Sequence, residues 1–219
     1  PYVRLWRFAR KRKVLPTPAE LASAGQAVGW RKLKLNRRAR TVTLHAPGMR
    51  LDVGGIAKGY TADAALALLK ARGINRALVA ASGDIAIGDP PPGREGWTVG
   101  IAGMGDEKGQ LARTMLLKNA AVSTSGDIEQ FIEIDGRRYS HILNPNTGLG
   151  LTNRIQATVI ARNATTTDAL ATITCILGPE RGLKLLDSMP GVSGLVIVAE
   201  EGQSKRLLSR RFPRAMMEP

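Results

Sequence analysis

Residues 51–60 read Leu51-Asp-Val-Gly-Gly-Ile-Ala-Lys-Gly-Tyr60, and within this stretch the residue pattern changes from that of a strand to that of a helix. We expect a short strand over 49–53, a turn at the glycine pair and a helix over 56–71, because apolar residues then recur at helical spacing. The apolar residues 76–81 predict the next strand. Residues 49–81 are therefore interpreted as a strand–helix–strand unit.

A second passage of this kind is expected over 155–199. In it a strand precedes a helix that Asn163 would cap, and Pro179 opens another helix before the last strand. Three further segments alternate as antiparallel hairpins do. They lie at 31–46, 130–143 and 192–209, the last turning at Glu201-Gly202. The predicted fold class is mixed α/β, or α+β, with two similar strand–helix–strand half-units and antiparallel hairpins.

The first part of the chain carries two different signals. Residues 1–16 are expected to form an extended or irregular basic lead, in which Trp6 and Phe8 act as apolar anchors. The next residues contain a capping box, because Thr17 and Glu20 stand three apart on either side of a proline. They predict a helix that stops at Gly29.

Composition limits the class of protein. The chain has 219 residues, of which 43% are hydrophobic, so it can bury the core of one large domain or two small ones. The net charge is +14, and part of the excess lies in residues 4–13 and 205–214. This charge either indicates an anionic partner or serves only to keep the chain soluble. Aromatic residues make up 4%, which argues against a protein that stacks single-stranded bases. The single cysteine, Cys175, permits no internal disulfide and is expected in the core.

The glycine turn has the features of an anion site. Backbone N–H groups at the start of a helix have no partner within the helix, and Gly54 and Gly55 would let a phosphate approach them. Lys58 would add a positive charge, and Asp52 could accept a hydrogen bond from a ligand. The alternative is an ordinary strand-to-helix turn with Lys58 in solvent.

Two other segments carry candidate chemistry. Asp168 and Thr172 share one helix face and present hard oxygen ligands suited to Mg²⁺, unless Asp168 is merely exposed and Thr172 packs. His141 lies near the end of a predicted hairpin strand, beside the tight loop 144–148, where it is either a general base or a structural histidine. Residues 121–127 predict a strand followed by a hydroxyl-rich turn. The hydroxyl groups would either donate hydrogen bonds to phosphate or ribose, or cap the backbone of their own turn.

Together these segments resemble the ApbE family, the FAD:protein FMN transferases. The resemblance covers nearly the whole chain and depends on five motifs in order. They are Met49-Arg-Leu-Asp-Val-Gly-Gly-Ile-Ala-Lys-Gly-Tyr60 with Asp63, Ala81-Ser-Gly-Asp-Ile85, Ala121-Val-Ser-Thr-Ser-Gly-Asp127, Tyr139-Ser-His-Ile-Leu-Asn-Pro-Asn-Thr-Gly148 and Thr167-Asp-Ala-Leu-Ala-Thr172.

The resemblance implies a single ApbE-like domain over 1–219 and Mg²⁺-dependent transfer of FMN from FAD to a threonine or serine of a target protein, with release of AMP. It implies a metal held by the Gly55 carbonyl, Asp168 and Thr172. It also implies contacts of Asp52, Lys58 and Leu143 with FAD, and a general base at His141.

Family analogy also suggests a membrane redox complex as the target and a periplasmic or membrane-associated location, with no nucleic acid as partner. The chain departs from the family at Ser82, where a glycine is usual, and at Asn144, where an aspartate is usual. The family's further N-terminal segment is expected to be missing. Two alternatives stay open: an FAD pyrophosphatase with water as nucleophile, and a non-catalytic basic module that binds nucleic acid or an anionic surface.

Overall fold

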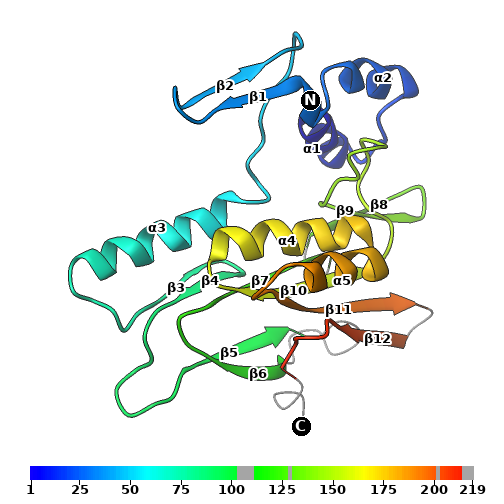
Figure 1. The fold of residues 1–219 in the computed structure, drawn as a ribbon. Helices are drawn as coiled ribbons and strands as arrows, with labels where there is room; N and C mark the ends of the chain where they lie inside the picture. The colour runs from blue at the N-terminus through cyan, green and yellow to red at the C-terminus, as the bar shows by residue number, and fades with distance from the viewer. Residues whose placement is uncertain (103–110, 128–129, 201–202, 214–219) are drawn as a thin grey trace. The chain divides into compact units, whose positions relative to one another are not determined.

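The computed structural model describes residues 1–102, 111–127, 130–200 and 203–213 (Figure 1). The chain divides into two compact units, each described here by itself. The first comprises Pro1–Asp52 and Gln130–Thr152, and the second comprises Val53–Glu129 and Asn153–Pro219. The predicted turn Glu201-Gly202 and Arg214 of the second basic segment lie outside the described residues. Within those residues, no helix combines the length and the apolar character needed to cross a bilayer.

The first unit contains two helices and two separate hairpins. Its helices are α1 (Tyr2–Arg12) and α2 (Pro18–Gln26), followed by a 3-10 turn (Trp30–Lys32). Its strands pair antiparallel as β1 (Leu33–Asn36) with β2 (Thr41–Leu44) and as β8 (Phe131–Ile134) with β9 (Arg137–Ser140). The predicted capping box is confirmed, since the Glu20 N–H donates to Thr17 Oγ1 and the Thr17 N–H donates to Glu20 Oε2.

The expectation of an irregular lead over 1–16 is wrong, because residues 2–12 form α1. Tyr2, Trp6 and Ala9 recur at helical spacing, and the latter two are buried. Trp6 packs against Tyr139 with ring centroids 5.6 Å apart, and its Nε1–H donates to the Ser140 carbonyl at 3.2 Å. Trp6 is thus the expected anchor, whereas Phe8 is 47% exposed. The many arginines of this segment made the narrow apolar face of the helix hard to recognise in the sequence.

The second unit is built on a six-stranded antiparallel sheet with the order β12-β11-β10-β7-β4-β3. The strands are β3 (Leu78–Ala81), β4 (Asp84–Ile87), β7 (Ala121–Gly126), β10 (Ile155–Ala161), β11 (Ser193–Glu200) and β12 (Gln203–Leu208). Three helices cover one face: α3 (Ala57–Ala71), α4 (Ala164–Leu177) and α5 (Pro179–Ser188) (Figure 1). The hairpin of β5 (Trp97–Ala102) and β6 (Leu111–Leu117) packs on the other face, where Val99 and Met115 join the core.

Helices with antiparallel strands confirm the predicted mixed α+β class. Most predicted elements are present, including the cap of α4, where the Thr166 N–H donates to Asn163 Oδ1 at 2.8 Å. The predicted strand over 49–53 is absent, because these residues pair with no other strand and Leu51 and Val53 are more than half exposed. The first of the two strand–helix–strand passages therefore begins at its helix.

We expect Arg211→Ala to lower the free energy of unfolding by about 1–3 kcal/mol, because it removes a charged donor that several carbonyl groups at the end of α5 share. Arg211 Nη2 donates to the carbonyls of Leu186, Asp187 and Met189 at 3.1, 2.8 and 2.7 Å. Its neighbour Arg210, with an 88% exposed side chain, is the control, and Arg210→Ala should change stability by less than about 0.5 kcal/mol. Urea unfolding measures both, and equal effects would contradict a specific role for Arg211.

Candidate functional site

Helices α3 and α4 approach each other at a glycine. The Gly59 N–H donates to Asp168 Oδ2 at 3.0 Å, although the two residues are far apart in the chain. A Cβ built on Gly59 would lie 2.8 Å from the Asp168 Cβ, so only glycine permits this approach. One turn away, a Cβ on Gly55 would lie 3.7 Å from Thr172 Oγ1. The glycine turn and the Asp168–Thr172 face of α4, predicted separately, therefore lie side by side.

Asp168 is a buried carboxylate, with 2% of the residue exposed. Burial raises its pKa above the ordinary value of 3.8, and the nearby Asp84 charge acts in the same direction. The hydrogen bond from the Gly59 N–H and the Lys58 charge oppose this shift. The simple alternative of an exposed helix aspartate is thereby excluded.

Lys58 pairs with a carboxylate that we did not single out from the sequence. Its Nζ donates to Asp84 Oδ2, and Asp84 is 1% exposed at the start of β4. The other oxygen, Asp84 Oδ1, is buried and has no hydrogen-bond partner among the described residues. A buried acceptor without a donor is unfavourable unless a ligand satisfies it. The only sequence signal for Asp84 is its place in the family motif Ala81-Ser-Gly-Asp-Ile85, which assigns it no role.

Hydroxyl groups connect β7 to α4. Ser123 Oγ lies 2.6 Å from Thr167 Oγ1, and Ser125 Oγ lies 3.1 Å from Thr172 Oγ1. The prediction of a hydroxyl-rich turn over these residues is wrong, since β7 continues as a strand through Gly126 and pairs with β10. Ser125 instead orients the hydroxyl of Thr172.

In the first unit, Asp52 and Leu143 line the same hollow of about 490 Å³. Arg7 of α1 also lines it and pairs with Asp52, with 2.9 Å between Arg7 Nη2 and Asp52 Oδ2. Trp30 borders it as well. Two residues that the family resemblance assigned to FAD thus share a cavity with an aromatic ring and a cation.

His141 follows β9 in the first unit, and its orientation is set by the backbone. Its Nδ1 lies 3.1 Å from the Gln130 carbonyl oxygen, which can only accept. The neutral ring therefore carries its proton on Nδ1, and Nε2 is the basic nitrogen. The loop that follows is closed by Asn144, whose Oδ1 accepts from the Asn146 N–H at 2.9 Å. The asparagine that replaces the family's usual aspartate thus keeps a turn-forming oxygen.

Ser82 adopts a left-handed conformation with φ of 60° in the turn between β3 and β4. This conformation costs a non-glycine residue about 1–2 kcal/mol, whereas glycine loses about 0.5–1 kcal/mol through the entropy of its unfolded chain. We therefore expect Ser82→Gly to raise the free energy of unfolding by about 0.5 kcal/mol. Ser82→Ala keeps the Cβ and should give no gain. Urea unfolding of both variants checks this, and equal stabilisation would rule out backbone strain as the cause.

The residues near Gly55 fit a small hard cation. A carboxylate, a hydroxyl and a backbone carbonyl are oxygen ligands of the kind Mg²⁺ takes, and it leaves its other positions to water or phosphate. Among the described residues no three His, Cys, Asp or Glu side chains gather as a metal site. Asp168 would supply the carboxylate of such a cation site, while Asp84 forms the ion pair with Lys58.

Comparison with known proteins identifies the family to which the chain belongs. The model of the ApbE family matches residues 1–196. The chain is 34% identical over 213 residues to the protein named FAD:protein FMN transferase of Treponema pallidum, an alignment that covers 91% of this chain and 59% of the relative. A protein of that name from Klebsiella pneumoniae is 29% identical, with 61% of its length covered. The chain thus spans about three fifths of the length of these curated relatives.

Solved structures agree with the fold. The apo form of the flavinyl transferase ApbE of Pseudomonas stutzeri has a TM-score of 0.82 and 28% identity, covering all of this chain and 68% of that one. The ApbE protein of Thermotoga maritima has a TM-score of 0.81 and 31% identity, covering all of this chain and 70% of that one.

Proposed function

Because this chain belongs to the ApbE family, we propose that it transfers FMN from FAD to the hydroxyl of a threonine or serine in a target protein and releases AMP. The observation that carries the proposal is the meeting of Gly55 and Lys58 with Asp168 and Thr172, which are more than a hundred residues later in the chain. It combines backbone, a cation and hard oxygen ligands, as a site for a diphosphate and a divalent ion requires.

In this proposal the Gly55 carbonyl, Asp168 and Thr172 hold Mg²⁺, which when bound neutralises charge on the diphosphate. Ser125 donates to or accepts from the Thr172 hydroxyl and holds it in one rotamer. Asp84, whose carboxylate is buried, holds the half-exposed Lys58 through their ion pair, so that the ammonium is in place before an anion arrives. Asp52 and Leu143 contact FAD in the hollow of the first unit.

The chemical step is a displacement at phosphorus. The acceptor hydroxyl forms a bond to the phosphorus on the FMN side of FAD, and the bond from that phosphorus to the oxygen of AMP breaks. His141 takes the hydroxyl proton on Nε2, because Nδ1 is committed to the Gln130 carbonyl. AMP leaves with the bridging oxygen. By family analogy we further propose an acceptor on a membrane redox complex and a periplasmic or membrane-associated location.

The test incubates the protein with FAD, Mg²⁺ and a peptide bearing an acceptor threonine. We expect AMP release together with a peptide that has gained FMN, both seen by mass spectrometry. Free FMN and AMP with an unmodified peptide would instead indicate an FAD pyrophosphatase. No release of AMP at all would contradict both reactions and favour a binding module.

A further inference from the structure

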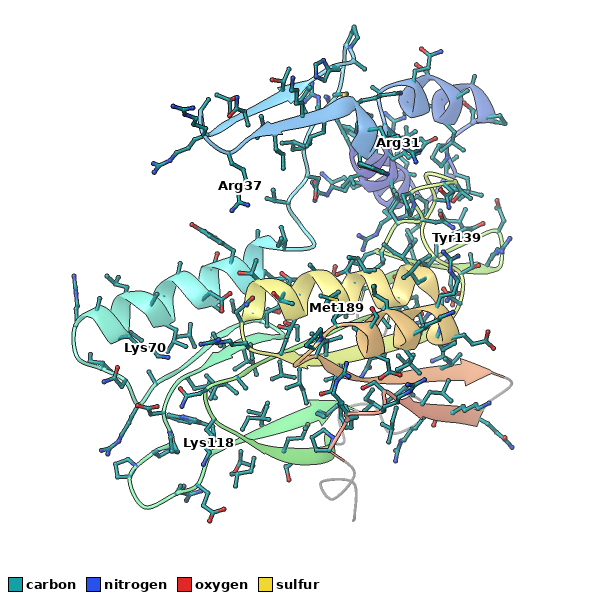
Figure 2. The ribbon with its side chains drawn as sticks, in the orientation of Figure 1. Arg31, Arg37, Lys70, Lys118, Tyr139 and Met189 are labelled. Carbon is teal, nitrogen blue, oxygen red and sulfur yellow. The ribbon has the colours of Figure 1, made fainter. Side chains whose placement is uncertain are left out.

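The β1–β2 hairpin has an unusual charge distribution. No aspartate or glutamate occurs from Leu21 to Leu51, whereas the hairpin and the turn before it are rich in cations. These cations are Arg31, Lys32, Lys34, Arg37, Arg38 and Arg40. Arg31 stacks on Trp30 and Lys32 donates to the Gln26 carbonyl, but the other four form no ion pair within the described residues. The charged side chains of the hairpin are therefore all positive, and Arg37 extends from its tip (Figure 2).

The same hairpin exposes apolar side chains on one face. Leu35 lies directly opposite Val42 in the antiparallel register, so both side chains point to the same face. Leu35 is 64% exposed and Val42 is 49% exposed. Trp30, in the 3-10 turn just before the hairpin, is 78% exposed. These three apolar side chains, which have arginines and lysines beside them, are thus largely uncovered by the other described residues.

We propose that this hairpin is a peripheral contact for an anionic lipid bilayer. Cations beside a bilayer bind its anionic headgroups, while tryptophan and aliphatic side chains enter the interface. Both features are needed and both are present on one short element. A nucleic acid partner is disfavoured, because an exposed aliphatic pair contributes nothing to phosphate contacts. The hairpin and the turn before it also hold a single Phe, Tyr or Trp ring for stacking, that of Trp30. The inference does not depend on the proposed FMN transfer, and it assigns a surface to the membrane association proposed above.

The experiment measures co-sedimentation of the whole protein with vesicles of phosphatidylcholine, with and without phosphatidylglycerol. We expect binding only when phosphatidylglycerol is present, with affinity falling as salt is raised. The combined variant Lys34→Gln, Arg37→Gln and Arg38→Gln should bind about a hundredfold more weakly, since each lost cation costs about fivefold. The variant Leu35→Gln with Val42→Gln should lose about tenfold, which a purely electrostatic contact would not.

The control removes the same charge elsewhere. The variant Arg181→Gln, Lys205→Gln and Arg206→Gln changes three exposed cations of the second unit and should bind vesicles as the unsubstituted protein does. Equal loss in both triple variants would show that net charge alone drives binding and would overturn the proposal. Unchanged binding by the hairpin variants would also overturn it, because another part of the protein would then cover or replace the hairpin. Tighter binding to duplex DNA than to anionic vesicles would favour the nucleic acid partner instead.

Discussion

Replacing Asp168 with asparagine is expected to lower Mg²⁺-dependent turnover of FAD by about a thousandfold or more. Asparagine keeps the shape of the side chain and an oxygen that accepts from the Gly59 N–H. It removes the negative charge on which a divalent cation in this site depends. The loss should therefore be in cation binding and turnover rather than in the fold.

The free energy of unfolding separates these two effects. Because burial raises the pKa of Asp168, its ionised form is unfavourable in the folded protein without metal. Asp168→Asn in the presence of EDTA should be at least as stable as the unsubstituted protein at neutral pH. The difference should shrink as pH falls below the raised pKa of the folded protein, and it should vanish below the ordinary value of 3.8, where the carboxyl is neutral in both states.

Asp63→Asn is the matched control for Asp168→Asn. Its carboxylate accepts from the Ala164 and Thr165 N–H groups at 2.8 Å each, so it caps the start of α4 without belonging to the proposed site. This variant should lose stability, by about 1 kcal/mol, and keep its Mg²⁺ dependence. Turnover assays with a titration of Mg²⁺ measure both variants. Normal turnover by Asp168→Asn would show that the metal ligands are assigned wrongly.

Gly59→Ala is expected to destabilise the protein by about 3 kcal/mol or to prevent folding. The added Cβ would lie 2.6 Å from the Ala164 carbonyl carbon and 2.8 Å from the Asp168 Cβ. These neighbours belong largely to backbone, which cannot move as the end of a flexible side chain can. The gain of about 1 kcal/mol in helix propensity from glycine to alanine is smaller than this clash.

Gly55→Ala is the control for Gly59→Ala, because the nearest atom to its new Cβ is Thr172 Cγ2 at an ordinary 3.5 Å. Its free energy of unfolding should change by less than about 1 kcal/mol. Thermal and urea unfolding measure both substitutions. If Gly59→Ala were as stable as Gly55→Ala, α3 and α4 would not approach as closely as the structure has them.

Local signals in the sequence predicted most elements of the fold. The capping box at Thr17 and the cap at Asn163 each act within a few residues, and both are present. The order of the six-stranded sheet could not be predicted, because it depends on pairing between distant strands such as β4 and β7. The missing strand at 49–53 has the same cause, since an apolar stretch becomes a strand only where an edge is available to pair with it.

The candidate site was partly predictable for a similar reason. Asp168 and Thr172 share a helix face by spacing alone, and Lys58 follows from the helix start. Asp84 was missed because its role depends on the tertiary contact with Lys58 rather than on local sequence. Ser125 was assigned to a turn because alternating small polar residues resemble a loop as much as a buried strand.

The lone thiol of the chain offers a reporter for the motions of the ligand-bearing helix. Cys175 lies on α4, one turn beyond Thr172, and its Sγ contacts the Ser125 carbonyl at 3.3 Å. Burial raises its pKa to about 12, so alkylating reagents can attack only when this helix lifts from the sheet. The rate at which Cys175 is alkylated in the native protein therefore reports how often the helix that carries Asp168 opens. Slower alkylation on addition of Mg²⁺ or FAD would show that the ligand binds, without any need for turnover.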